Sequence, residues 1–219
     1  IILWMALKGY FKINRRSISV TLSIVFMAII GYSAILYINP KRNGQGVEAL
    51  LYKIKIAPTE PFKTRINKEN WKEFHDNYRS YENILTVRQM SAAGSETVIF
   101  GKGMGSTVDL HKKVWLGNEA QRFISILHNG FMTVFLKSGL LGLALFVLSI
   151  FLLFKKPKIT NPAIEQINMI MQGTGIFMFI SSWVFMGLYF TADNKSILIG
   201  FLLCYREILV KRAGSTIKG

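Results

Sequence analysis

The stretch Ile124-Ser-Ile-Leu-His128-Asn129-Gly130-Phe131 is where a polar segment runs directly into a long apolar one. The apolar run covers residues 131–154 and contains a single charge, Lys137. As a helix, a run of this length extends roughly 36 Å, enough to cross the hydrocarbon core of a bilayer with some tilt. We therefore predict a transmembrane helix over residues 128–154, with His128 at its rim, facing water and headgroups.

Further apolar runs predict further membrane helices. Hydrophobic residues make up 51% of the chain and gather in runs, whereas a soluble domain spreads them more evenly. We predict transmembrane helices over residues 17–38 and 167–190, and a short one within residues 197–219, which end in a basic tail. Residues 1–16 are expected to be the end of a preceding membrane helix and a basic loop, so that the chain is the C-terminal portion of a longer protein.

The net charge of +15 is concentrated in the short segments that flank the apolar runs. Cytoplasmic loops of membrane proteins carry an excess of Lys and Arg, so we predict that the N-terminal flank, residues 155–166 and the C-terminus are cytoplasmic. Residues 39–127 then form a long extracytoplasmic loop, and residues 191–196 a short outer turn. This distribution argues against nucleic acid as a partner. The basic excess within the loop suits a negatively charged lipid or substrate instead.

The extracytoplasmic loop is predicted to be mostly helical. Aromatic and apolar residues recur every three or four positions after Asn67, which predicts a capped amphipathic helix over about residues 68–90. Residues 47–61 have mixed periodicity and are predicted to be irregular, with room for one short helix. Residues 97–100 are predicted to be extended, and residues 108–123 to form a polar connector.

The motifs exclude several kinds of site. Gly101, Gly103 and Gly105 match neither the dinucleotide-binding fingerprint, whose third glycine follows the second by three positions, nor the P-loop. They remain compatible with a tight turn at positive φ or with a close backbone approach to another phosphate. The three histidines form no HExxH pair, no Asp-x-Asp occurs, and a single cysteine permits no disulfide, so no metal site or disulfide framework is predicted.

Four side chains attract attention, and each has a simpler alternative. His128 is either functional or an interfacial histidine bonded to the backbone. Arg79 and Arg88 are either functional or part of a solvated helix face. Lys137 lies inside an apolar run, so its ammonium group must snorkel, pair with a partner or face a polar cavity.

Together, several strings resemble the O-antigen ligase and O-antigen polymerase superfamily. The strings are Phe100-Gly-Lys-Gly-Met-Gly-Ser-Thr-Val-Asp109-Leu110, Ile126-Leu-His-Asn-Gly-Phe131 and Leu136-Lys-Ser-Gly-Leu-Leu-Gly142. Upstream, Tyr78-Arg79-Ser80-Tyr81-Glu82 resembles the Arg-x-aromatic-Glu pattern of some polymerase-like members. The resemblance extends from about Arg79 to Gly142.

The resemblance implies an all-α, polytopic, GT-C-like membrane glycosyltransferase. Such an enzyme transfers a glycan from an undecaprenyl-diphosphate carrier to an acceptor hydroxyl on the outer, periplasmic side of the bacterial inner membrane. It uses no metal or other cofactor. Its partners are the carrier-linked glycan, an acceptor glycan or glycolipid, the bilayer and, for polymerases, a chain-length regulator.

The resemblance also implies roles for single residues. His128 would be the general base that deprotonates the acceptor hydroxyl, and Arg79 would bind the diphosphate, since guanidinium offers permanently charged bidentate donors. The remaining residues implied in substrate binding are Asn129, Glu82, Arg88, Arg122, Lys137, Gly101, Gly103 and Gly105.

Other functions remain open at this point. A polymerase of O-antigen, exopolysaccharide or capsule is slightly favoured over an O-antigen ligase, because the pattern of residues 79–82 is polymerase-like. A transporter or flippase of lipid-linked oligosaccharide could use the same basic loop without forming a bond. A noncatalytic chain-length regulator is disfavoured by the number of predicted spans.

Overall fold

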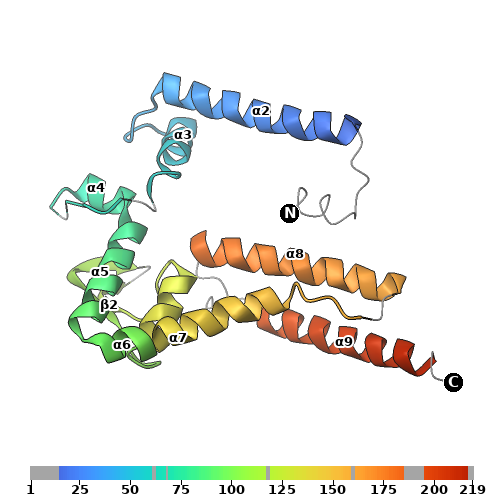
Figure 1. The fold of residues 1–219 in the computed structure, drawn as a ribbon. Coiled ribbons are helices and arrows are strands. Elements are labelled where there is room, and N and C mark those ends of the chain that lie inside the picture. Colours follow the sequence, from blue (N-terminus) through green and yellow to red (C-terminus); the bar gives the residue numbers. More distant parts are fainter. Residues whose placement is uncertain are drawn as a thin grey trace. The chain divides into compact units, whose positions relative to one another are not determined.

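The computed structural model describes residues 15–60, 63–67, 69–116, 119–158, 161–184 and 195–216. These residues are mostly helical (Figure 1). The chain divides into two compact units, Ile1–Tyr81 and Glu82–Gly219. The predicted end of a preceding membrane helix within residues 1–14, residues 185–190 of the predicted third span and most of the outer turn lie outside the described residues.

The described part of the first unit starts with helix α2 (Arg15–Ile38), which ends where Asn39 adopts a positive φ of 51° before Pro40. Its segment Ile18–Ile38 is long and apolar enough to cross a membrane, and its large apolar side chains, such as Leu22 and Phe26, are exposed. A soluble unit buries such a helix, so this exposure suits an apolar surrounding.

Helix α3 (Val47–Ile56) confirms the short helix that the sequence allowed in this region. Two polar contacts tie the last turn of α3 to the C-terminal part of α2 and to the residue that follows it. The Tyr32 hydroxyl donates to the Lys55 carbonyl oxygen at 3.2 Å, and the Lys55 ammonium donates to the side-chain oxygen of Asn39.

The predicted single helix over residues 68–90 is wrong. Two helices, α4 (Trp71–Asp76) and α5 (Tyr78–Ala92), replace it and are separated at Asn77. Asn77 has φ −124° and ψ 28°, outside the helical region, and its side-chain amide donates back to the Glu73 carbonyl at 2.8 Å. Asparagine competes in this way with helical backbone bonds, which explains the break.

The predicted cap is also displaced by three residues. Asn70, not Asn67, is the N-cap of α4, and its side-chain oxygen accepts from the backbone N–H groups of Lys72 and Glu73 at 3.1 and 3.2 Å. Asn67 instead accepts from the N–H of Glu69 at 3.0 Å, in the turn that precedes the helix. Both asparagines have the same cap preference, so sequence alone does not choose between them.

Two further expectations for the loop are wrong. Residues 97–100 belong to helix α6 (Ser95–Phe100), not to an extended run. Residues 108–123 form an antiparallel β-hairpin of β1 (Val108–Leu116) and β2 (Glu119–Ile124), with an irregular register between Asp109 and Val114. The described part of the chain is therefore mostly helical with one two-stranded sheet, and the all-α expectation holds only in part.

Three long helices complete the second unit: α7 (Gly130–Leu152), α8 (Pro162–Val184) and α9 (Lys195–Thr216). They pack around an apolar cluster of Phe131, Ile150, Leu153, Ile167, Met171, Met178 and Leu202. Of the four predicted spans, only Ile18–Ile38 and Gly130–Leu152 are long and apolar enough to cross a membrane within the described residues. The other two are helical where they are described.

The charged residue Arg206, which lies within the apolar run of α9, has a structural role. The Arg206 side chain is buried, and its guanidinium donates to the carbonyl oxygen of Lys155 at 2.9 Å, just beyond the end of α7. From α8, the Gln172 amide donates to the carbonyl oxygen of Phe154 at 3.2 Å. The last carbonyl groups of α7 accept from the N–H groups of Leu153, Phe154 and Lys155, and α8 and α9 supply donors to the carbonyl groups of the segment that follows the helix.

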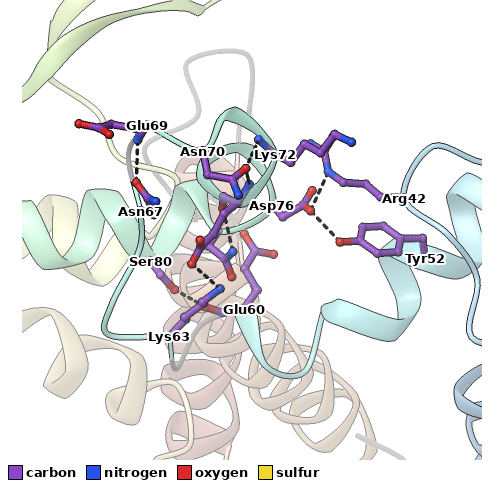
Figure 2. Close-up of polar contacts among 12 residues, drawn as sticks. Arg42, Tyr52, Glu60, Lys63, Asn67, Glu69, Asn70, Lys72, Asp76 and Ser80 are labelled. Carbon is purple, nitrogen blue, oxygen red and sulfur yellow. Dashed lines mark hydrogen bonds and ion pairs between the residues drawn. The ribbon is translucent and has the colours of Figure 1, made fainter.

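A polar cluster joins α3 to α4 within the first unit (Figure 2). One carboxylate oxygen of Asp76 accepts from Arg42 Nε at 2.8 Å and from the Tyr52 hydroxyl at 2.7 Å. Burial, together with the hydrogen bond to this carboxylate, raises the pKa of Tyr52 from 10.0 to about 12.

This shift predicts a loss of stability at high pH. Because the folded state holds the Tyr52 proton more tightly than the unfolded state, its contribution is complete below pH 10 and is lost as the pH rises through about 12. We expect Tyr52→Phe to remove one tyrosine that ionises near pH 12 in a tyrosinate absorbance titration, and to flatten the fall in stability over that window.

The control for this prediction is Tyr37→Phe, which removes an exposed phenol. This variant should leave the absorbance change near pH 12 at its full amplitude. The same amplitude near pH 12 in Tyr52→Phe as in the unaltered protein would contradict the assignment.

Candidate functional site

The organising feature of the second unit is a contact between Glu82, on α5, and His128, just before α7. The Glu82 side chain is 1% exposed, and one of its oxygens accepts the backbone N–H of His128 at 3.0 Å. The ring atom Nδ1 of His128 lies 3.0 Å from both carboxylate oxygens. The two residues are 46 positions apart in the sequence, and in the fold the Glu82 carboxylate contacts both the backbone and the ring of His128.

This geometry fixes the tautomer of the neutral imidazole. A carboxylate only accepts hydrogen bonds, so Nδ1 must carry the proton that it shares with Glu82. In this tautomer the lone pair resides on Nε2. The His128 side chain is 34% exposed, so the ring can meet a ligand, whereas the carboxylate below it cannot. Glu82, which we expected to bind substrate, is buried and bonded to the backbone and the ring of this histidine.

The backbone around His128 is held by the start of α7. The buried hydroxyl of Thr133 accepts the N–H of Leu127 at 3.0 Å, and the side chain of Asn129 accepts the N–H of Met132 at 3.2 Å. Asn129 is thus the N-cap of α7. Neither role was predicted, although Asn129 stands immediately before an apolar run, where caps are common.

The cap gives a test of Asn129. We expect Asn129→Ala to lower stability by about 1 kcal/mol, because one helix N–H loses its acceptor, while Asn129→Ser keeps the cap and the stability. Thermal unfolding of the two variants measures this difference. Equal unfolding temperatures for Asn129→Ala and the unaltered protein would contradict the role of the cap.

Two turns further along α5 from Glu82, Gln89 makes a second contact between this helix and a distant part of the chain. The amide of Gln89 donates to the carbonyl oxygen of Asp109 at 2.6 Å and accepts its N–H at 3.1 Å, which attaches α5 to β1. Residues 82 and 89 are seven positions apart and therefore share one face of the helix. One face of α5 thus positions both the β-hairpin and the loop that carries His128.

The arginines named from the sequence have different surroundings. Arg122, on β2, makes a bidentate contact with Asp109 on β1, with both N–O distances at 2.7 Å. Hydrogen bonds from Arg122 hold the pKa of Asp109 well below its usual range, so the pair is ionised at neutral pH. Arg88 is exposed on α5, and Arg79 is partly buried at the start of α5, in the first unit.

The glycine loop packs against a break in α7. Gly139 has φ 64° and ψ −162° inside the helix, so the carbonyl groups before it lose helical partners. The N–H groups of Lys102 and Gly103 donate to the carbonyl oxygens of Leu136 and Lys137 at 2.9 and 3.0 Å and replace them. The glycine loop therefore makes a close backbone approach to α7.

Two glycines allow this approach. A Cβ at Gly101 would lie 2.4 Å from the backbone of Lys137, and one at Gly139 would lie 2.3 Å from the carbonyl oxygen of Ile99. Gly101 and Gly103 have positive φ, as a tight turn requires, but Gly105 does not. For the ammonium group of Lys137 we considered snorkelling, pairing with a partner and facing a polar cavity. The structure shows pairing, since the group donates to the Ser106 carbonyl.

Among the described residues, no three His, Cys, Asp or Glu side chains gather as metal ligands. Comparison of the chain with protein-family models, curated proteins and solved structures finds no match.

Proposed function

We propose that the protein is a membrane glycosyltransferase. It transfers or polymerises glycan units from an undecaprenyl-diphosphate carrier onto an acceptor hydroxyl at the outer face of a bacterial inner membrane. The observation that carries this proposal is the buried Glu82 carboxylate on Nδ1 of a partly exposed His128. A carboxylate that orients a histidine leaves the outer ring nitrogen ready to accept a proton.

The reaction follows from that arrangement. The acceptor hydroxyl attacks the anomeric carbon of the carrier-linked sugar, and Nε2 of His128 takes its proton. The bond from the sugar to the diphosphate breaks, and carrier diphosphate leaves with the electron pair. Glu82 stabilises the imidazolium that forms, and the proton then passes to solvent or to the leaving group.

The leaving group needs positive charge. Arg79 is the residue that the family resemblance assigns to it, and the exposed guanidinium of Arg88 is a further candidate. Arg122 would have to exchange its Asp109 carboxylate for phosphate, which makes it the weaker choice. No divalent cation is required, because guanidinium groups can neutralise charge as it develops on the diphosphate.

The position of His128 in the chain suits a lipid-linked substrate. It stands two residues before α7, one of the two helices in the described part of the chain that are long and apolar enough to cross a membrane. The histidine would therefore lie at the membrane boundary, where the diphosphate of a polyprenyl lipid is also expected. The proposal places the long loop on the extracytoplasmic side of a multi-pass protein.

A transporter of lipid-linked oligosaccharide is the second candidate, and the break of α7 at Gly139 favours it. Broken helices within membrane spans form substrate and ion sites in many transporters. Here the carbonyl groups freed by the break are bonded to the N–H groups of Lys102 and Gly103. A break occupied in this way offers fewer ligands to a transported ion, so we rank this function second.

Turnover separates the two functions. The protein would be reconstituted in proteoliposomes with undecaprenyl-diphosphate-linked repeat units, and glycan length on a gel and carrier release would be followed together. We expect one undecaprenyl diphosphate to be released for each new glycosidic bond. Movement of lipid-linked glycan across the bilayer without bond formation would overturn the enzyme and favour the transporter.

A further inference from the structure

Between Glu82 and His128 the chain travels along α7 and comes back. At both of these residues it stands at the start of α7, since the Glu82 carboxylate bonds to His128. In between, helix α6 lies beside α7, and the carbonyl group of Ile99 packs directly on Gly139 (Figure 1). The chain therefore moves along α7 as far as Gly139 and then returns, and both parts belong to the second unit.

Gly139 lies well inside the candidate span. It follows Gly130, the first residue of α7, by nine positions, which corresponds to roughly 13 Å along a helix. The hydrocarbon core of a bilayer is about 30 Å thick. With His128 at the membrane boundary, as the proposed function places it, residues 99–101 lie at the depth of the lipid acyl chains.

The side chains at this depth are apolar and exposed. Phe100 is 64% exposed and Ile99 45%, and Met104 in the glycine loop is exposed as well. On α7, Leu140 and Leu141 follow the break directly and are also exposed. In water this surface would be an apolar patch that needs a partner, whereas acyl chains cover it without cost.

The backbone of the loop is also suited to an apolar surrounding. Non-helical backbone is costly at membrane depth unless its polar groups have partners within the protein. The N–H groups of residues 101–103 donate, in order, to the carbonyl oxygens of Thr97, Leu136 and Lys137 at 2.8, 2.9 and 3.0 Å. These bonds satisfy the loop and the broken part of α7 at the same time.

The charged residues of the segment stand on either side of its deepest point. Glu96 lies in the first turn of α6, three positions before Ile99, and Lys102 follows Ile99 by three positions. The long stem of an exposed lysine lets its ammonium group reach toward the headgroups. The ammonium group of Lys137 is held by the Ser106 carbonyl on the returning side.

We propose that α6 and the glycine loop form a re-entrant segment, which enters the outer leaflet beside α7 and returns, with Ile99 and Phe100 in contact with lipid acyl chains. The inference rests on the membrane placement of α7 in the proposed function, but not on the chemistry at His128. It changes the topology expected from the sequence, because residues 39–127 then do not lie wholly outside the membrane.

The test measures the surroundings of single nitroxide labels on the full chain in proteoliposomes. Cys204, the one cysteine of the chain, is exposed and would be replaced by serine, and the label would be attached to Phe100→Cys. Oxygen concentrates among acyl chains and a water-soluble nickel complex in the aqueous phase, so the ratio of their collision rates, measured by power-saturation EPR, identifies the surrounding phase. Leu145→Cys, at an exposed position of α7, is the reference for lipid, and Lys113→Cys, at an exposed position of β1, is the reference for water.

We expect the oxygen-to-nickel ratio at position 100 to approach that at position 145 and to exceed that at position 113 several-fold. Met104→Cys gives a second probe of the segment, and both native side chains are exposed, so neither change removes core packing. A ratio at position 100 equal to that at position 113 would overturn the proposal, because this part of α7 would then stand in water. Low collision rates with both reagents would overturn it too, since protein would then cover the segment.

The label at position 145 separates this proposal from the proposed function. If position 145 is surrounded by lipid and position 100 is not, the re-entrant segment is wrong while α7 still crosses the membrane. If position 145 is itself in water, α7 does not cross, and the membrane placement in the proposed function is wrong as well. Glycan transfer by the unaltered protein is measured separately and does not enter this result.

Discussion

Replacing His128 with alanine is expected to lower the rate of glycan transfer by about 10²-fold or more in the proteoliposome assay. Removal of a positioned general base commonly has an effect of this size. Carrier-linked glycan should still bind, so KM for the donor should change little while kcat falls. The ring is one-third exposed, and its loss should cost little stability.

Glu82→Gln tests whether the carboxylate acts through the histidine. An amide can still accept the backbone N–H of His128, but its NH₂ group can donate to Nδ1 and move the ring proton to Nε2. The base would then be blocked. We expect kcat to fall by about 10²-fold with an unchanged donor KM, a split that a purely structural role of Glu82 would not produce.

The two substitutions should not be additive. If Glu82 works only through His128, the double variant should be about as slow as His128→Ala alone. His111→Asn is the matched histidine control, since His111 is exposed and has a φ of 57°, a conformation that asparagine tolerates. Full activity in His128→Ala would remove the general base from the mechanism, and additive losses would give Glu82 an independent role.

Gly139→Ala is expected to destabilise the second unit by roughly 3 kcal/mol. The residue has φ 64°, where alanine is strained, and the new Cβ would lie 2.3 Å from the Ile99 carbonyl oxygen and 2.6 Å from the Gly101 nitrogen. Backbone atoms cannot rotate away, so the loop must separate from α7. The two hydrogen bonds from Lys102 and Gly103 would then be lost.

Gly173→Ala is the matched control, because Gly173 lies within α8 and a Cβ added there would have no heavy atom within 4 Å. This change should be neutral or mildly stabilising, as alanine favours helix over glycine. Thermal unfolding compares the two variants, and amide hydrogen exchange at residues 102 and 103 reports the loop. Equal unfolding temperatures would mean that the break does not need glycine.

The apolar runs could be predicted because membrane length and hydrophobicity are local properties. The β-hairpin was not predicted. Val108, Leu110 and Val114 are buried at alternate positions, but Lys112 interrupts the alternation and most of the neighbouring residues are charged. The division between α4 and α5 depends on a single asparagine whose side chain returns to the backbone. Such competition between side chain and helix has no periodic signature.

The candidate site was predictable only in part for a similar reason. His128 was identified by its position before an apolar run, and Glu82 by a short motif. Their contact depends on how α5 meets the start of α7, which no spacing encodes. Gly139 was hidden because glycine is frequent in membrane helices, and only its positive φ distinguishes it from Gly142 in the same helix.

The contact between residues 99–103 and the break in α7 is made by main-chain atoms on both sides. Substitutions of neighbouring side chains therefore have little means of accommodating a methyl group at Gly101 or Gly139. In a saturation mutagenesis experiment these two positions should tolerate no residue with a Cβ. Second-site suppressors should arise by shortening or lengthening the loop, and not by exchanging the side chains around it.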